Sequence, residues 1–229
     1  MRYAYYPGCS LTGSARRLDK GVKRVFARLG HELVEIPDWN CCGAFEYGDR
    51  KDLIEFSEAN LRKSRVLDMV EGSVVAPCPA CYKNLKEANR ENTHAIYHPL
   101  ELFNGDATAS LRIEKDLKGQ VFTPYYGCLL MRPDETAIGD EEVMERFIGR
   151  LGGEIEGTKV RAKCCGGNQF FINKWATEKL SHIVLNGSKG TIVVFCPLCH
   201  MALTSFSKNR KIIYFTDLVL YAIGERKTL

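Results

Sequence analysis

The sequence predicts an α/β fold made of two tandem, pseudo-symmetric repeats, each with a short parallel sheet. Three observations support this prediction. The ten cysteines follow one spacing pattern stated twice, short stretches around them recur in both halves, and strand-like and helix-like segments alternate along each half. Such alternation is typical of parallel sheets covered by helices. We expect the repeats to span residues 1–107 and 118–229, with the join near the turn Asn104-Gly105-Asp106.

All ten cysteines belong to the repeated pattern. In the first half, one cysteine is followed after 31 residues by Cys-Cys-Gly and after 34 more by Cys-x-x-Cys, and in the second half these gaps are 35 and 29 residues. The first set is Cys9, Cys41, Cys42, Cys78 and Cys81, and the second set is Cys128, Cys164, Cys165, Cys196 and Cys199. Five thiols in the same order in each half predict two sites of one design.

Each repeat is expected to alternate four strands with four helices. In the first repeat we predict strands over residues 3–6, 32–36, 73–76 and 96–97, and helices over 16–29, 49–70 and 82–89. The helix over 16–29 carries apolar residues at helical spacing and Gly30 at its end, where glycine suits a cap. The helix over 49–70 has Leu53, Phe56, Leu61 and Leu67 among its apolar positions.

The second repeat echoes the first outside the cysteines as well. Tyr125-Tyr126-Gly127-Cys128 resembles Tyr5-Tyr6-Pro7-Gly8-Cys9, and Val193-Val194-Phe195-Cys196 resembles Val74-Val75-Ala76-Pro77-Cys78. We therefore expect two Rossmann-like units with the same order of elements.

The cysteines follow predicted strands, at the edge where sites form in open parallel sheets. Cys78 and Cys81 are expected to open a helix, with Pro79 in its first turn, where a missing N–H costs nothing. Free N–H groups and the positive end of the helix dipole would favour thiolates there. The same prediction holds for Cys196, Pro197 and Cys199.

Ten cysteines could instead form a disulfide framework, which is typical of short secreted chains. This chain has 229 residues, enough for a core without covalent staples, and its first residues lack the apolar run of a signal peptide. No window is apolar enough for a transmembrane segment. We therefore expect a cytoplasmic protein, with a membrane-associated complex as the alternative setting, and thiols that bind metal.

Composition excludes several other functions. The chain is 45% hydrophobic and 26% charged with a net charge of +4, and its basic residues are scattered, so we expect no nucleic-acid partner. Neither a GxGxxG fingerprint nor a Walker A motif is present, which argues against nucleotide or flavin binding by this chain.

The pattern favours a polynuclear site over a single zinc ion. A zinc ribbon would use two Cys-x-x-Cys pairs and leave six thiols without a role. Adjacent cysteines suit a larger site, because their diverging side chains can reach different metals. Iron–sulfur clusters are held by cysteine thiolates, usually four per cluster, so five thiols leave open whether one is spare or bridging.

The double motif resembles the paired CCG domains of the heterodisulfide reductase family, over nearly the whole chain. The resemblance implies two [4Fe-4S] clusters of noncubane type, each bound by one set of five cysteines, with a disulfide substrate between them. It also implies two partner proteins: a flavin subunit and a ferredoxin-type iron–sulfur subunit. No ferredoxin-like cysteine run is present in this chain, so electrons must come from such a partner.

The resemblance leads us to expect the catalytic iron–sulfur subunit of a heterodisulfide reductase-like complex, which reduces or forms a disulfide or a related sulfur substrate. The alternative is an electron relay in another oxidoreductase complex of the fumarate or succinate, lactate or glycolate, or sulfur-oxidising type. Two clusters could each supply one of the two electrons that a disulfide requires.

Few other residues are candidates for the site. His200, directly after Cys199, is a candidate proton donor, with a surface histidine as the alternative. Gly43 and Gly166-Gly167 are expected to let the backbone approach the bound group. Trp39, Phe45 and Phe170-Phe171 could shield it or simply pack in the core, and His98 is expected to be structural.

Overall fold

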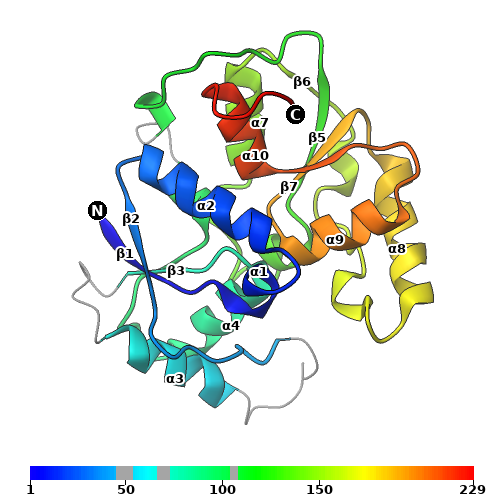
Figure 1. The fold of residues 1–229 in the computed structure, drawn as a ribbon. Coiled ribbons are helices and arrows are strands. Elements are labelled where there is room, and N and C mark those ends of the chain that lie inside the picture. Colours follow the sequence, from blue (N-terminus) through cyan, green and yellow to red (C-terminus); the bar gives the residue numbers. More distant parts are fainter. Residues whose placement is uncertain (45–53, 66–72, 104–107) are drawn as a thin grey trace. The chain divides into compact units, whose positions relative to one another are not determined.

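Two parallel four-stranded sheets form the framework of the chain (Figure 1). The structure is a computed structural model and describes residues 1–44, 54–65, 73–103 and 108–229. The chain divides into unit 1, Met1–Ser110 with Pro133–Ile138, and unit 2, Leu111–Arg132 with Gly139–Leu229. Each unit contains one of the sheets.

Unit 1 has the strand order β2-β1-β3-β4, with all neighbours parallel. Its strands are β1 (Arg2–Tyr5), β2 (Glu32–Glu35), β3 (Val74–Val75) and β4 (Ile96–Tyr97). Its helices are α1 (Gly8–Thr12), α2 (Arg16–Arg28), α3 (Ile54–Ser64), α4 (Pro79–Ala88) and the 3-10 helix η3 (Pro99–Leu102).

Unit 2 repeats this topology with the order β6-β5-β7-β8, again all parallel. Its strands are β5 (Val121–Tyr125), β6 (Glu154–Ile155), β7 (Thr191–Val194) and β8 (Ile212–Tyr214). Its helices are α6 (Cys128–Met131), α7 (Val143–Arg150), α8 (Lys174–Gly187), α9 (Pro197–Phe206) and α10 (Phe215–Ala222), with 3-10 helices η4 (Thr158–Val160) and η5 (Gly167–Gln169). The predicted α/β fold with two repeats and short parallel sheets is confirmed.

The amphipathic helix α2 shows why the sequence folds in this way. Leu18, Val22 and Phe26 recur on one face and are buried, and burying one such side chain contributes about 1.5–3 kcal/mol. The helix ends before Gly30, whose φ of 74° lies in the left-handed region that glycine adopts without strain.

Some predicted elements differ from the observed ones. Helix α4 begins at Pro79 rather than residue 82, because Pro79 occupies the first helical position after Cys78. The predicted helix over 49–70 corresponds to α3, and its residues 49–53 and 66–70 lie outside the described part of the chain. Phe56, predicted on the apolar face of this helix, is 46% exposed, because the buried face carries Ser57 and Asn60.

No described helix has the length and the apolar character needed to cross a bilayer.

Candidate metal centres

Each five-cysteine set lies within one unit, at the carboxyl ends of its strands. In unit 1, Cys9 follows β1, the Cys41-Cys42 pair follows β2 and Cys78 follows β3. We call Cys9, Cys41, Cys42, Cys78 and Cys81 the first thiol set, and Cys128, Cys164, Cys165, Cys196 and Cys199 the second thiol set. All ten cysteines are described, and none forms a disulfide with another described residue.

Within each set the thiols contact one another. Cys42 Sγ lies 3.4 Å from Cys81 Sγ, and the corresponding atoms of Cys165 and Cys199 are 3.3 Å apart. In the first set, a hydrogen bond with Cys41 raises the pKa of Cys9. The pKa of Cys41 is lowered, mainly by a hydrogen bond from Cys42 and to a smaller extent by one from Cys9. Thiols far apart in the sequence therefore share one small volume in each unit.

The thiol sets are buried on one side and open on the other. Cys42, Cys78 and Cys81 are buried, whereas Cys9 and Cys41 are exposed. In the second set, Cys165, Cys196 and Cys199 are buried and Cys128 and Cys164 are half-buried. A group held by either set would have one face accessible to solvent or to a reaction partner.

Backbone N–H groups point at several of the sulfur atoms. Gly43 N lies 3.5 Å from Cys41 Sγ, and Gly166 N lies 3.3 Å from Cys164 Sγ. Cys199 N donates to Cys196 Sγ at 3.5 Å in the first turn of α9. These donors favour an anionic sulfur.

Sequence reasoning missed a glycine that precedes the first cysteine of each set. Gly8 has a φ of 68°, and a Cβ atom there would lie 2.8 Å from Cys81 Sγ. Gly127 has a φ of 78°, and its Cβ would lie 3.3 Å from Cys199 Sγ. The Gly-Cys dipeptide at the start of both sets was the available signal.

A buried tyrosine in each unit was also missed. The Tyr6 hydroxyl donates to the carbonyl of Asn40 at 2.6 Å, and the Tyr125 hydroxyl donates to that of Lys163 at 2.6 Å. These carbonyls belong to the residues directly before the two Cys-Cys pairs. Burial, together with the neighbouring thiols, raises the pKa of both tyrosines, so their hydroxyls remain protonated donors.

The inner faces of α3 and α8 hold the Cys-Cys loops through polar side chains. Ser57 donates to the carbonyl of Cys42 at 3.3 Å, and Ser181 donates to that of Cys165 at 2.9 Å. The Asn60 side chain accepts from Asn40 N and donates to Asn40 O, both at 2.9 Å. Polar residues at helical spacing where apolar ones are expected were the signal for this role.

The other candidates from sequence lie in varied environments. His200 is half-exposed in the first half of α9 and its ring meets that of Tyr214 edge to face, with centroids 6.3 Å apart. His98 is buried, and its ring contacts Pro77 O at 3.1 Å and accepts from Leu100 N, which is a structural role. Trp39 donates to Glu35, and Phe45 lies outside the described residues.

The aromatic pair after the second Cys-Cys-Gly does not pack in the core. Phe171 is 70% exposed, Phe170 is half-buried, and the two ring centroids are 5.2 Å apart. Gly43 and Gly166 have φ angles of 78° and 75°, so glycine is favoured at the turn after each cysteine pair. A Cβ at Gly167 would lie 2.8 Å from the Leu198 carbonyl oxygen.

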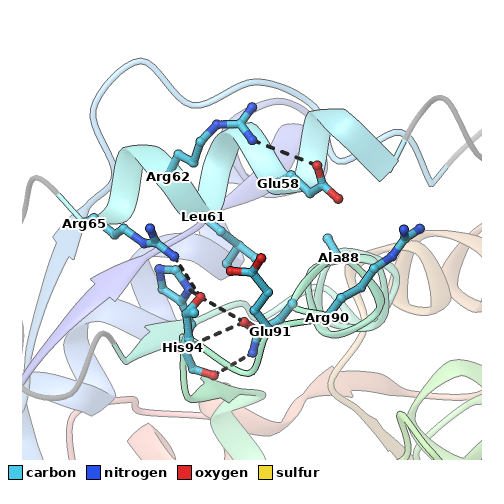
Figure 2. Close-up of a pocket in the computed structure, with 10 residues that line it drawn as sticks. Glu58, Leu61, Arg62, Arg65, Ala88, Arg90, Glu91 and His94 are labelled. Carbon is cyan, nitrogen blue, oxygen red and sulfur yellow. Dashed lines mark hydrogen bonds and ion pairs between the residues drawn. The ribbon is translucent and has the colours of Figure 1, made fainter.

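Unit 1 has a cavity of about 380 Å³, and the lining residues, which Figure 2 draws, include no cysteine. Its lining comes from the carboxyl-terminal parts of α3 and α4 and from the segment before β4, which is the opposite edge of the sheet. Arg65 in this lining donates to Thr93 at 2.9 Å, and Arg62 lies 3.9 Å from Glu58. Positive side chains at helix carboxyl ends are a usual stabilising arrangement, so we assign no ligand to this cavity.

The donor chemistry of the thiol sets fits a cysteine-bound polynuclear group. Each set offers only sulfur donors, three of them buried, with backbone N–H groups directed at the sulfurs. No three of the described His, Cys, Asp and Glu side chains have the placement of ligands around one metal ion. The feature that indicates a bound group is therefore the contact among thiols within each set, and not a preformed geometry for a single ion.

A family model of known proteins matches both repeats of the chain. The model of the CCG family, described as a cysteine-rich domain, matches residues 3–86 and 122–204. The chain is 23% identical over 263 residues to the 8-methylmenaquinol:fumarate reductase membrane anchor subunit of Wolinella succinogenes, covering 97% of this chain and 92% of that protein.

A second relative is an uncharacterized iron-sulfur protein of Methanocaldococcus jannaschii. It is 22% identical over 225 residues, and the match covers 93% of this chain but only 44% of that protein. Among solved structures, an aspartate racemase homologue from Pyrococcus horikoshii matches with a TM-score of 0.38 and 9% identity, over 98% of both chains. A score this low carries no argument about fold or function.

Proposed function

Because the chain belongs to the CCG family of cysteine-rich domains, we propose that it is an iron–sulfur subunit of an oxidoreductase complex. The observation that carries this proposal is the convergence of five thiols in each unit, with three buried and two on an accessible side. Two further supports are the relatives, one named an iron-sulfur protein and the other a fumarate reductase subunit.

The proposed ligands are all ten cysteines, five for each of two [4Fe-4S] clusters of noncubane type. A bound cluster supplies one-electron transfer at a potential set by its surroundings. The chain's own groups bind the metal through thiolates and stabilise their charge with the N–H groups of Gly43 and Gly166. Gly8 and Gly127 leave room for the last thiol of each set.

The finer proposal is disulfide chemistry that uses both thiol sets, as in a heterodisulfide reductase. Reduction of a disulfide breaks the S–S bond, consumes two electrons supplied by a partner protein, and adds two protons, one to each thiol formed. His200, half-exposed one residue after Cys199, is the proposed source of one proton. The five-thiol design and its duplication support this proposal.

The second candidate is an electron relay without a substrate of its own. It is favoured by the fumarate reductase relative, whose match extends over nearly the full length of both proteins. In either case we propose two partner proteins: a flavin subunit and a ferredoxin-type iron–sulfur subunit. We place the complex in the cytoplasm, at the membrane surface if it follows the relative whose name includes a membrane anchor.

Metal analysis tests the shared part of both proposals. Protein purified without oxygen should be brown and should contain about eight irons and matching labile sulfide, four irons for each set. Stoichiometric zinc without labile sulfide would refute the iron–sulfur assignment.

Spectroscopy separates disulfide chemistry from relay. If the thiol sets act on sulfur substrates, adding 2-mercaptoethanol to the oxidised protein should change its EPR spectrum, and Cys42→Ser or Cys165→Ser should remove the change at one site. Iron is counted in the same samples, because serine is a poor replacement for a thiolate ligand. Full iron content with no response to a series of small thiols would favour the relay.

A further inference from the structure

The two thiol sets lie in different charge environments. In unit 1 the three residues before the Cys-Cys pair are Asp38, Trp39 and Asn40, and in unit 2 they are Arg161, Ala162 and Lys163. The first loop thus carries one negative charge and the second carries two positive charges. The difference arises at matched positions of two repeats with the same topology.

A third matched position adds to this difference. The first cysteine of each set lies in a short helix, α1 or α6. The residue at the carboxyl end of this helix, four places after the cysteine, is Gly13 in unit 1 and Arg132 in unit 2. Arg132 Nη2 donates to the carbonyl of Ala162 at 2.7 Å, two residues before Cys164. The guanidinium is therefore held beside the second Cys-Cys loop.

Counter-charges do not remove the difference. Asp38 lies 3.2 Å from Lys63, so the loop of unit 1 is neutralised. Arg161 lies 3.4 Å from Glu145, but Arg132 and Lys163 have no carboxylate partner among the described residues. Among the described residues, Arg132 is thus held beside the second Cys-Cys loop and Lys163 directly precedes Cys164, and neither charge has a carboxylate partner.

We propose that Arg132 and Lys163 raise the reduction potential of the centre held by the second thiol set above the value it would have without these two charges. This inference rests on the proposed function. One-electron reduction adds a negative charge to a centre already surrounded by thiolates, and nearby positive charge stabilises the reduced form. No bond is formed or broken in this step.

The difference in solvent exposure between the two sets would instead raise the reduction potential of the first centre relative to the second. Cys9 and Cys41 are exposed, whereas Cys128 and Cys164 are half-buried, and water stabilises the more highly charged reduced form. The effect of the two charges is therefore measured on the second centre by itself, through variants, rather than from the order of the two potentials.

The experiment is an EPR-monitored redox titration of the whole chain with its metal centres. We expect two midpoint potentials in the unaltered protein. Arg132→Gln and Lys163→Gln should each lower one potential and leave the other unchanged, and the double variant should lower the same one further. The potential that moves is assigned with a Cys9→Ser, Cys41→Ser variant, which should lose the signal of unit 1.

Two controls separate charge from structure. Arg132→Lys keeps the charge and should keep most of the potential, whereas Arg132→Gln keeps hydrogen-bond donors but loses the charge, so a role limited to the Ala162 hydrogen bond would not predict its effect. Lys208→Gln removes a charge before β8, at the opposite edge of the sheet, and should move neither potential. The shift caused by Arg132→Gln should shrink at high salt, because exposed charges are screened.

Either of two results would overturn the inference: neither potential moves in the double variant, or both move equally. These results are distinct from failure of the proposed function, which would appear as absence of iron and labile sulfide in the unaltered protein.

Discussion

Glycine before the first cysteine of each set avoids a collision with the last cysteine. At Gly8 the positive φ and the 2.8 Å approach of Cys81 Sγ act together, whereas at Gly127 the approach of Cys199 Sγ is 3.3 Å. Because Cys81 is buried, it cannot move away without disturbing the rest of the set. The geometry of the thiols is therefore coupled to the backbone at the start of α1.

We predict that Gly8→Ala destabilises the protein more than Gly127→Ala and reduces the iron bound by unit 1. Gly30→Ala is the matched control, because its φ is 74° but no atom lies within 4 Å of the new Cβ. The control should cost only the left-handed strain, about 1–2 kcal/mol, with iron unchanged. Denaturant unfolding and iron counting check this, and equal losses in Gly8→Ala and Gly30→Ala would contradict the steric argument.

The two tyrosines should differ in importance although their contacts look alike. Asn40 O accepts from both Tyr6 and the Asn60 side chain, whereas Lys163 O accepts only from Tyr125 among the hydrogen bonds of the described residues. Loss of a part-buried hydrogen bond such as that of Tyr125 costs about 0.5–1.5 kcal/mol.

We therefore predict that Tyr125→Phe lowers the free energy of unfolding by about 0.5–1.5 kcal/mol and that Tyr6→Phe lowers it by less. The measurement is urea denaturation of the two variants beside the unaltered protein. A larger loss in Tyr6→Phe would mean that the carbonyl of Asn40 depends on its tyrosine despite the second donor.

At the scale of elements, α3 shows how a site can override a hydrophobic pattern. Phe56 faces outward and Ser57 and Asn60 face inward, because the backbone of the Cys-Cys loop needs hydrogen-bond partners more than it needs an apolar neighbour. The equivalent helix α8 uses Ser181 and Thr177 for the loop of unit 2. These helices position ligand loops as well as covering a sheet.

We predict that Asn60→Ala destabilises the protein by about 1–3 kcal/mol, since it removes two hydrogen bonds to the Asn40 backbone and leaves Asn40 N–H without its partner, while Asn40 O still accepts from Tyr6. Glu55→Ala, an exposed change on the same helix, should be within about 0.5 kcal/mol of the unaltered protein. Thermal unfolding compares the two, and similar values for both would show that Asn60 does not hold the loop.

Regular elements were predictable from the sequence, and short ones were not. The period of apolar residues placed α2 to within one residue, and alternation of strands and helices placed the cysteines at the carboxyl ends of parallel strands. Helices α1 and α6 have five and four residues, too few for any period to show. The roles of Gly8, Tyr6 and Asn60 depend on contacts across 20 to 73 residues of sequence, which local patterns do not encode.

At the scale of the whole molecule, duplication gives two self-contained sets of ligands. All five cysteines of a set, the tyrosine, the glycine and the serine that hold it come from the same unit. Among these contacts of the described residues, the first set requires no residue of unit 2. Loss of one centre should therefore leave the ligands of the other in place.

We predict that Cys42→Ser and Cys165→Ser each reduce the iron content by about half, because a hydroxyl is a poor substitute for a buried thiolate ligand. The EPR signal that remains in one variant should be the signal lost in the other, and the double variant should have neither. The comparison needs iron and sulfide counts in the same anaerobic preparations, with Ser14→Ala as an exposed control in unit 1. If either single variant lost all its iron, the two sets would depend on each other, and the prediction of two self-contained centres would be wrong.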